Sequence, residues 1–212
     1  QWVWARQPIE EEYGYEEQAE GQRGEKHLVI NGERATLACR MRQDGLVSDG
    51  SSRLLVQPED WINADPDPLT RSTIEKLSSD SDLIAAHFGA KLSFGTAGLR
   101  AARGVGPSRM NRVSVRVAAR AIGGYLLDRG LSEKGVVIGY DARPDSDIYA
   151  LDSARLLTAL GVRCLLIDEP CPTPVVVWHQ MDRTTAGAIV VTASHNPSSD
   201  SGYKVYGPDG TQ

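Results

Sequence analysis

Apolar positions along the second half of the chain alternate between two spacings. Short runs rich in Val, Ile and Leu predict three buried strands, at 136–140, 163–167 and 188–192. Apolar residues spaced by three and four predict a helix from Asn111 to just before Gly130. Further helices are predicted from 147 to 160, where Gly161 stops the helix, and from Thr173-Pro174 to about 180. Strands that alternate with helices favour parallel pairing and right-handed crossovers. The pattern therefore predicts an α/β fold, a three-layer α/β/α domain with a mixed, largely parallel sheet.

A short helical segment is predicted before this domain. Asp67 followed by Pro68 has the form of a helix N-cap with proline at the first helical position. An apolar stripe then continues to Leu77, and a second short helix is expected from Asp82 to Phe88. Asp65 and Asp67 could instead suggest a metal site, but a capped helix start explains the pair better.

Residues 1–58 differ in character from the rest. Residues 1–26 are rich in Glu, Gln and Gly and show no sustained apolar period, which favours a mobile acidic arm over a partner-binding segment. The Asn-Gly pair within 27–37 lies between apolar runs and predicts a β-hairpin. We therefore divide the chain into an appendage of unknown role, partly disordered, at 1–58 and the α/β domain at 59–212.

Composition and charge narrow the class of protein. A chain of 212 residues with 41% hydrophobic content can build a sizeable core. Its formal net charge of -5 argues against a nucleic-acid partner. No segment has the length of a membrane span, and the N-terminus lacks the layout of a signal peptide, so the cytoplasm is expected. Cys39, Cys164 and Cys171 form no CxxC pair, so neither a disulfide framework nor a zinc site is predicted.

The segment after the strand at 188–192 carries the strongest candidate chemistry. Asn196-Pro197 ends that strand, so Ser194 and His195 lie on a loop at its carboxyl end, where open α/β sheets place ligands. Lys204 follows one short loop later. Together these residues supply a hydroxyl that can carry a group, a proton carrier and a positive charge. This combination suits phosphoryl chemistry.

Two further segments support an anion site. The segment 94–106 is glycine-rich, so its backbone can approach an anion closely, and the planar fork of Arg100 suits a phosphate. Asp141 and Arg143 come directly after the strand at 136–140, and they share an edge with Ser194 if the strands are parallel. A salt bridge that holds the loop and a direct role for Arg143 both remain open.

Three motifs in this order resemble those of the α-D-phosphohexomutases. The motifs are Phe94-Gly95-Thr96-Ala97-Gly98-Leu99-Arg100, Gly139-Tyr140-Asp141-Ala142-Arg143, and Thr192-Ala193-Ser194-His195-Asn196-Pro197 with Gly202-Tyr203-Lys204. Their form most resembles the phosphoglucomutase-2 and phosphopentomutase branch. The resemblance runs from about Trp61 to Gln212 and covers only the family's N-terminal, phosphoserine-bearing domain. It implies a phosphosugar mutase that interconverts a sugar 1-phosphate and a 6- or 5-phosphate through a sugar bisphosphate.

The resemblance also implies roles for individual residues. Ser194 would carry the phosphoryl group and, through that group, contact Mg²⁺, whose remaining ligands are absent from this chain. The implied catalytic residues are Ser194, His195, Lys204 and Arg100, and the residues implied to position the phosphate or the loop are Asn196 and Arg143. A sugar bisphosphate of the glucose 1,6-bisphosphate type would act as activator. The implied partners are the sugar phosphate and the remaining mutase domains.

The sequence departs from the family's pattern at two positions. Ala101 follows the arginine where many members have glycine, and Ser201 stands where asparagine is usual. The chain also stops just after the turn at 207–210, so we expect a domain that is truncated at its C-terminal edge. A non-catalytic folding or interaction module is therefore the alternative to a mutase domain. A serine hydrolase fits poorly, because Ser194 lacks the flanking glycines of a nucleophile elbow.

Overall fold

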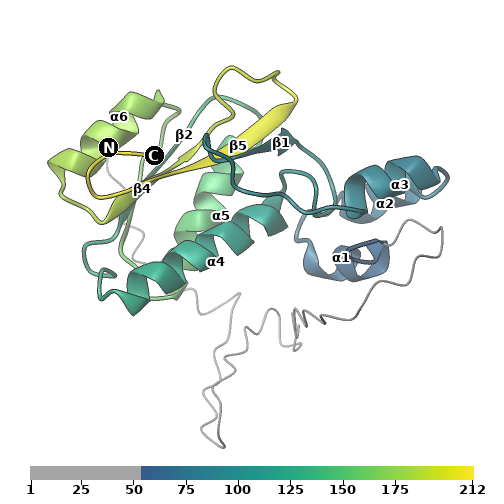
Figure 1. Ribbon diagram of the computed structural model, residues 1–212, viewed down its shortest axis with the longest axis horizontal. Helices are drawn as coiled ribbons and strands as arrows, with labels where there is room; N and C mark the ends of the chain where they lie inside the picture. The colour runs from purple at the N-terminus through teal and green to yellow at the C-terminus, as the bar shows by residue number, and fades with distance from the viewer. Residues whose placement is uncertain (1–53) are drawn as a thin grey trace, which may run out of the picture. The chain divides into compact units, whose positions relative to one another are not determined.

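The computed structural model describes residues 54–212 (Figure 1). The arm predicted at 1–26 and the hairpin predicted at 27–37 lie outside these residues. The helices are α1 (Pro58–Ala64), α2 (Thr70–Leu77), α3 (Ser81–Phe88), α4 (Arg112–Asp128), α5 (Ser146–Ala159) and α6 (Thr173–Asp182). The strands are β1 (Leu99–Ala102), β2 (Val136–Tyr140), β3 (Cys164–Leu166), β4 (Gly187–Val191) and β5 (Asp200–Tyr206). None of the helices found between residues 54 and 212 combines the length and apolarity that a membrane span needs.

The strands form one mixed sheet in the order β1-β5-β4-β2-β3. β2 pairs in parallel with β3 and with β4, whereas β5 pairs antiparallel with β4 and β1. The predicted α/β class and mixed sheet are confirmed. The sheet is half antiparallel rather than largely parallel, because a short loop returns the chain from β4 directly into β5 and β1 then joins the free side of β5.

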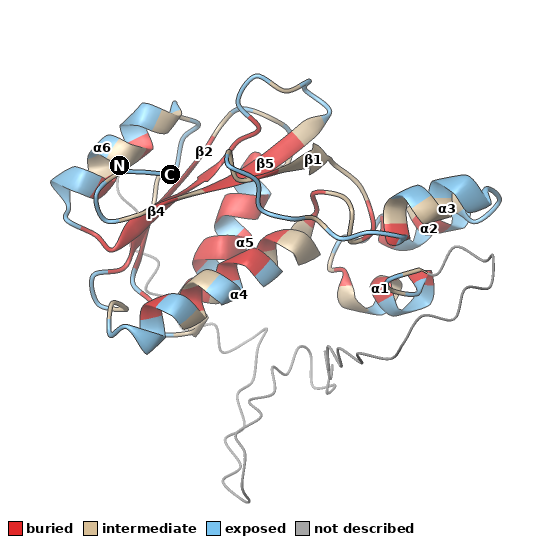
Figure 2. Ribbon diagram, in the orientation of Figure 1, coloured by how far each residue is buried: buried red, intermediate tan, exposed pale blue. Residues whose placement is uncertain are grey.

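Helices cover both faces of the sheet, as the three-layer prediction requires (Figure 1). One face packs on α4 and α5 through a core that includes Met110, Leu157, Ile138 and Tyr203. The other face packs on α6 through a smaller cluster that includes Val176 and Val190. Because both faces are covered, β2 and β4 are buried along their whole length (Figure 2). This explains why their sequences are continuous apolar runs.

The segment before the sheet is helical, as predicted, but its first helix and its caps differ. α1 was not predicted, and α2 begins at Thr70 rather than at Pro68. The prediction of Asp67 as the N-cap is wrong, because its Oδ1 accepts from Leu69 N and closes a turn before the helix, at 2.9 Å. Asp65 accepts from Trp61 Nε1 at 3.0 Å and from Thr70 Oγ1 at 2.8 Å. Asp65 therefore ties α1 to α2.

The three N-terminal helices position the glycine-rich segment. Trp61, Ile74, Phe88 and Val105 form a separate buried cluster, in which the Trp61 and Phe88 rings meet edge to face at 6.1 Å. Val105 O also lies 2.8 Å from His87 Nδ1. The cluster therefore anchors the segment that leads from β1 to α4.

The strand β1 lies where the sequence predicts a glycine-rich loop. Only Leu99 of its four residues is buried, so the alternation of apolar and polar residues is too weak to predict a strand. Tertiary pairing decides the conformation instead, because Leu99 lies opposite Tyr203 and Arg100 lies opposite Gly202 in β5. This pairing brings Arg100 to the edge that carries Ser194.

Two arginines of α4 hold α5 through one buried carboxylate. Arg112 donates to Asp152 at 2.7 and 2.8 Å, and Arg116 donates to the same group at 3.1 and 3.2 Å. The Asp152 side chain is only 2% exposed. Burial on its own raises the pKa of Asp152, but the hydrogen bonds from both arginines outweigh it and leave this pKa below its ordinary value. The carboxylate therefore stays charged and joins the two helices.

Candidate functional site

The candidate site is the loop that joins β4 to β5. Ser194 and His195 are exposed on this loop, whereas Thr192 and Ala193 before them are buried. The parallel register pairs Val191 of β4 with Tyr140 of β2, so the carboxyl ends of the two strands lie side by side. Ser194 therefore lies at the carboxyl edge of the sheet, as predicted.

Ser194 has a backbone conformation that is unusual for a serine. Its φ is 59°, in the left-handed region that residues with a side chain rarely adopt. Ser194 N donates to Thr192 Oγ1 at 3.0 Å, and Asn196 N donates to Ala193 O at 3.2 Å. Such a conformation costs about 1–3 kcal/mol and persists only where neighbouring contacts enforce it.

Arg143 is the principal contact of this loop. Its Nη2 donates to Ser194 O and to Asn196 O, both at 2.8 Å. Its Nη1 donates to Asp200 O at 3.1 Å and also to Pro197 O. Its Nε donates to Asp141 Oδ2 at 3.0 Å. The predicted proximity of Arg143 and Ser194 is confirmed.

Asn196 connects the loop to β1 and β5. Arg100 Nη1 donates to Asn196 Oδ1 at 3.4 Å, and Asn196 Nδ2 donates to Asp200 Oδ2 at 3.0 Å. The Nε atom of Arg100 is buried without a hydrogen-bond partner in the structure. A buried donor without a protein partner is uncommon, and such a donor is suited to bind a ligand.

Lys204 projects from the same face of the sheet as Arg100. Arg100 lies opposite Gly202, and Lys204 follows Gly202 by two residues, which is the side-chain repeat of a strand. Tyr203 points to the other face, where its hydroxyl donates to Ser153 Oγ of α5 at 2.9 Å. There is no room for a side chain at Gly202, because a Cβ at this position would clash with backbone oxygens of the chain segments on both sides.

Arg100 and Lys204 form an unbalanced pair of positive charges. Lys204 is 9% exposed, and burial lowers its pKa, with a further lowering by the charge of Arg100. Within residues 54–212 no carboxylate forms a salt bridge with either side chain. Two such cations on neighbouring strands favour a bound anion between them.

The structure thus brings together most of the predicted site residues. Direct contacts connect Ser194, Asn196, Arg143 and Arg100, and the strand register places Lys204 beside Arg100. His195 lies near these residues only because it follows Ser194 in the sequence.

Two residues of the loop network escaped the sequence analysis. Arg103 donates to Ser199 O from its backbone N at 3.1 Å and to Asp145 Oδ2 from Nη1 at 2.9 Å. Asp200 binds Asn196, as described above. The only signal in the sequence was that each is a charged residue beside a recognised motif, which does not distinguish a loop contact from a solvated side chain. Ser201, which stands where the family usually has asparagine, is buried in β5, and its hydroxyl has no partner in the described structure.

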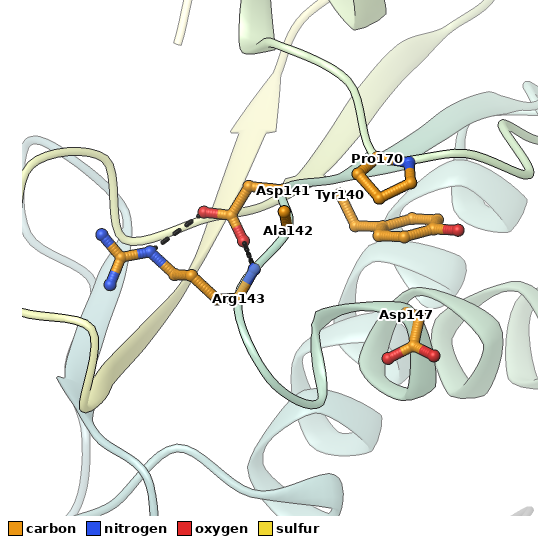
Figure 3. A pocket seen from close by; sticks show the side chains of 6 residues that line it. All are labelled: Tyr140, Asp141, Ala142, Arg143, Asp147 and Pro170. Atoms are coloured by element: carbon orange, nitrogen blue, oxygen red, sulfur yellow. Dashed lines mark hydrogen bonds and ion pairs between the residues drawn. The ribbon is translucent and has the colours of Figure 1, made fainter.

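A hollow of about 360 Å³ lies next to the loop network (Figure 3). It is lined by Tyr140, Asp141, Ala142, Arg143, Asp147 and Pro170. In the view of Figure 3, the Arg143 guanidinium lies on the opposite side of Asp141 from Tyr140 and Pro170. The hollow therefore shares Asp141 and Arg143 with the loop network.

The described residues supply cations rather than metal ligands. Among residues 54–212, no group of three or more His, Cys, Asp or Glu side chains is placed to hold a metal ion. An ion at this loop would therefore need a ligand oxygen carried by Ser194 and further ligands from outside these residues.

Fold and loop together define a class of protein: α/β domains that present a serine at the carboxyl edge of a mixed sheet. A family model described as phosphoglucomutase/phosphomannomutase, alpha/beta/alpha domain I, matches residues 91–212, which is more than half of the chain. The chain belongs to this family of phosphosugar mutases, and the match covers its domain I.

Individual relatives agree with this assignment. Mouse phosphopentomutase is 35% identical over 171 residues, which cover 76% of this chain and 28% of the mouse protein. A probable phosphomannomutase of Haemophilus influenzae is 48% identical over 99 residues, which cover 46% of this chain and 20% of that protein. Phosphopentomutases thus stand among the similar proteins, as the motifs indicated.

A solved structure shows the same fold. The crystal structure of a putative phosphomannomutase from Thermus thermophilus aligns with a TM-score of 0.52 and 32% identity. The alignment covers 57% of this chain and 26% of that one. The chain therefore spans less than a third of the length of the proteins it matches here.

Proposed function

We propose that this chain is the phosphoserine domain of a phosphosugar mutase, with Ser194 as the phosphoryl carrier. The complete mutase, in which this domain is joined to the remaining domains of the family, would interconvert a sugar 1-phosphate and a 6- or 5-phosphate. The observation that carries the proposal is the unbalanced pair Arg100 and Lys204 beside the serine loop. A phosphoryl group on Ser194 would add about −1.5 to −2 charge at this edge.

The chemistry divides among the residues of this edge. A hydroxyl oxygen of the sugar attacks phosphorus, the bond from phosphorus to Ser194 Oγ breaks, and the hydroxyl proton ends on the serine oxygen. His195 and Lys204 are our candidates to move that proton, an effect typically worth about 10²- to 10⁴-fold. Arg100 stabilises the charge on the phosphoryl oxygens, and Asn196 orients Arg100 toward the loop.

The lowered pKa of Lys204 fits a role in proton movement. A lysine that gives up its proton more readily than usual is a better acid near neutral pH. The same shift follows from burial beside Arg100, so an anion bound between the two would reverse part of it. Binding of an anionic substrate would thus raise the pKa of Lys204 again.

Magnesium fits this edge only in part. A phosphoryl oxygen on Ser194 would be the one ligand from this chain, and the remaining ligands would come from other domains. When bound, the ion would supply further positive charge beside the phosphoryl group. The cations Arg100 and Lys204 are the contribution of this domain to the same purpose.

The decisive experiment locates the phosphate. The complete mutase is incubated with a sugar bisphosphate, and its peptides are analysed by mass spectrometry. We expect a phosphate on Ser194 that is lost when sugar monophosphate is added, and wild-type turnover by a Ser194→Ala variant would refute the proposal. Label confined to Ser198 or Ser199 would refute it as well.

The 212-residue chain by itself should show no mutase activity. Stabilising a transferring phosphoryl group needs charges on several sides, and this domain supplies one side. Complementation with the separate remaining domains tests the alternative of a non-catalytic module. Restored turnover that disappears with Ser194→Ala would support the mutase role, whereas restored turnover that ignores Ser194 would favour the module.

A further inference from the structure

Arg143 uses all of its hydrogen-bonding capacity within the protein. An arginine side chain carries five N–H donors. In Arg143 one binds Asp141, and the other four bind the carbonyl oxygens of Ser194, Asn196, Pro197 and Asp200. No donor is left for a phosphate. Arg143 therefore differs from Arg100, whose buried Nε is without a partner.

The four carbonyls span the loop from one end to the other. Peptide groups that point their oxygens at one guanidinium cannot rotate independently, so the backbone dihedrals between Ser194 and Asp200 are fixed together. Among these dihedrals is the φ of 59° at Ser194, which is unfavourable on its own. The contacts of Arg143 offset that cost.

Asp141 in turn fixes the guanidinium. Its Oδ2 accepts from Arg143 Nε at 3.0 Å, and its Oδ1 accepts from Arg143 N at 3.1 Å and from Ser146 Oγ at 2.8 Å. Ser146 is fully buried at the start of α5. The chain of contacts therefore runs from the rigid end of α5 through Asp141 and Arg143 to the loop.

We propose that Arg143 is a positioning residue that holds Ser194 in its left-handed conformation and so aims the hydroxyl at Arg100 and Lys204. This inference rests on the proposed function of Ser194 as phosphoryl carrier. It assigns Arg143 to the loop backbone and not to the phosphate, and it makes the planar fork essential rather than the charge. A misplacement of about 1 Å in a reacting group can cost about 10²-fold in rate.

A lysine substitution separates these two roles. Arg143→Lys keeps the positive charge but has three donors on one nitrogen and cannot reach four carbonyls. We expect kcat of the complete mutase to fall by about 10²-fold, as far as in Arg143→Gln, with KM within about threefold of wild type. A lysine variant that retains most of kcat, or that loses only KM, would overturn the proposal.

Guanidinium rescue gives a readout that a merely structural role would not move. Guanidinium chloride at low, non-denaturing concentration should restore part of kcat in Arg143→Ala, because the free ion can donate to the same carbonyls. Methylammonium chloride, of equal charge, should not. Rescue by both ions, or by neither in a folded variant, contradicts the assignment.

Arg103→Lys is the matched control. Arg103 also contacts the loop, but its guanidinium reaches only one loop carbonyl, Ser199 O, at 3.4 Å. We expect a smaller fall in kcat than in Arg143→Lys, because the lysine keeps the charge and the substitution removes the guanidinium contact with only one loop carbonyl. An equal loss in Arg103→Lys and Arg143→Lys would show that any arginine near the loop matters and would overturn the specific role of Arg143.

Two measurements keep the test decisive. Phosphate on Ser194 of the wild-type enzyme is measured first, because its absence refutes the proposed function and leaves the role of Arg143 a separate question of loop geometry. If Arg143→Lys does not fold, Asp141→Asn serves instead, since it leaves the four loop bonds but loosens the guanidinium. A loss of about tenfold in kcat is then expected, and an unchanged kcat would overturn the proposal.

Discussion

Two groups of cations in this domain have opposite surroundings. On the face covered by α4 and α5, Arg112 and Arg116 surround one buried carboxylate, Asp152. On the other face, Arg100 and Lys204 lie on neighbouring strands, and within the described residues neither forms a salt bridge. The first group has satisfied its charge within the fold, and the second has not.

This difference in counter-charge indicates which group of cations contributes to stability and which contributes to function. Two arginines that share a carboxylate join helices, and removing the carboxylate removes the hydrogen bonds that join them. Two cations without a carboxylate repel each other and disfavour the folded state, which a protein tolerates at a place where a ligand will supply the anion. We therefore expect substitutions in the first group to change stability and substitutions in the second to change turnover.

The largest effect is expected from Lys204→Met. Loss of the charge and of the exchangeable proton should lower kcat of the complete mutase by about 10²- to 10⁴-fold. The free energy of unfolding at pH 7 should not fall, because the buried charge beside Arg100 is removed. Steady-state kinetics and denaturant unfolding measure the two quantities. Lys134→Met, at the opposite edge of the sheet, is the control and should change neither.

Asp152→Ala should act in the reverse way. It removes four hydrogen bonds between α4 and α5, and we expect a loss of about 3 kcal/mol in the free energy of unfolding. Turnover at a temperature where the variant is folded should remain within about threefold of wild type. Arg155→Ala, an exposed arginine on the same helix, is the control. A loss of turnover without a loss of stability would break the comparison.

The free energy of unfolding should rise with pH through both groups, but in different pH ranges and for different reasons. The folded pKa of Asp152 is lowered, so its stabilisation is present above the ordinary carboxyl pKa and is lost as pH falls through the lowered value. The folded pKa of Lys204 is lowered too, so between that value and the ordinary lysine pKa the unfolded state binds more protons and stability rises with pH. Lys204→Met should abolish the alkaline rise, and Asp152→Ala should weaken the acid loss. Unfolding free energies across the pH range provide the measurement.

The smallest effect is expected from removal of residues 1–53. This deletion tests whether the cations around Asp152, or the pair Arg100 and Lys204, depend on the segment before the described domain. Residues 1–53 show no sustained periodic pattern of apolar residues in their sequence. We therefore expect the melting temperature to change by no more than about a few degrees. Removal of residues 1–64 is the contrast, because it also deletes Trp61, which is 6% exposed and packs on Phe88. That variant should be strongly destabilised. Aggregation of the shorter deletion would contradict the prediction.

Much of the fold was predictable because its signals are local. The runs that became β2 and β4 are apolar throughout, and the spacing in α4 and α5 repeats at three and four. Gly130, with a φ of 65°, follows the end of α4 as the sequence indicates. The strand β1 was not predictable, because only one of its residues is buried and its partner lies about a hundred positions later.

The sequence by itself determined the α/β class, the family and the place of Ser194 at the end of a strand, because those depend on periodicity and on motifs that are contiguous in the chain. Only the tertiary structure decided which arginine keeps a buried donor without a partner and which one binds the loop carbonyls. The sequence does not distinguish Arg100 from Arg143. In the structure, strand pairing places Arg100 so that its Nε has no partner, whereas all five donors of Arg143 bind the protein. The hydrogen bonds that distinguish them join residues some 50 to 100 positions apart, and contacts of that range are fixed only when the sheet has formed.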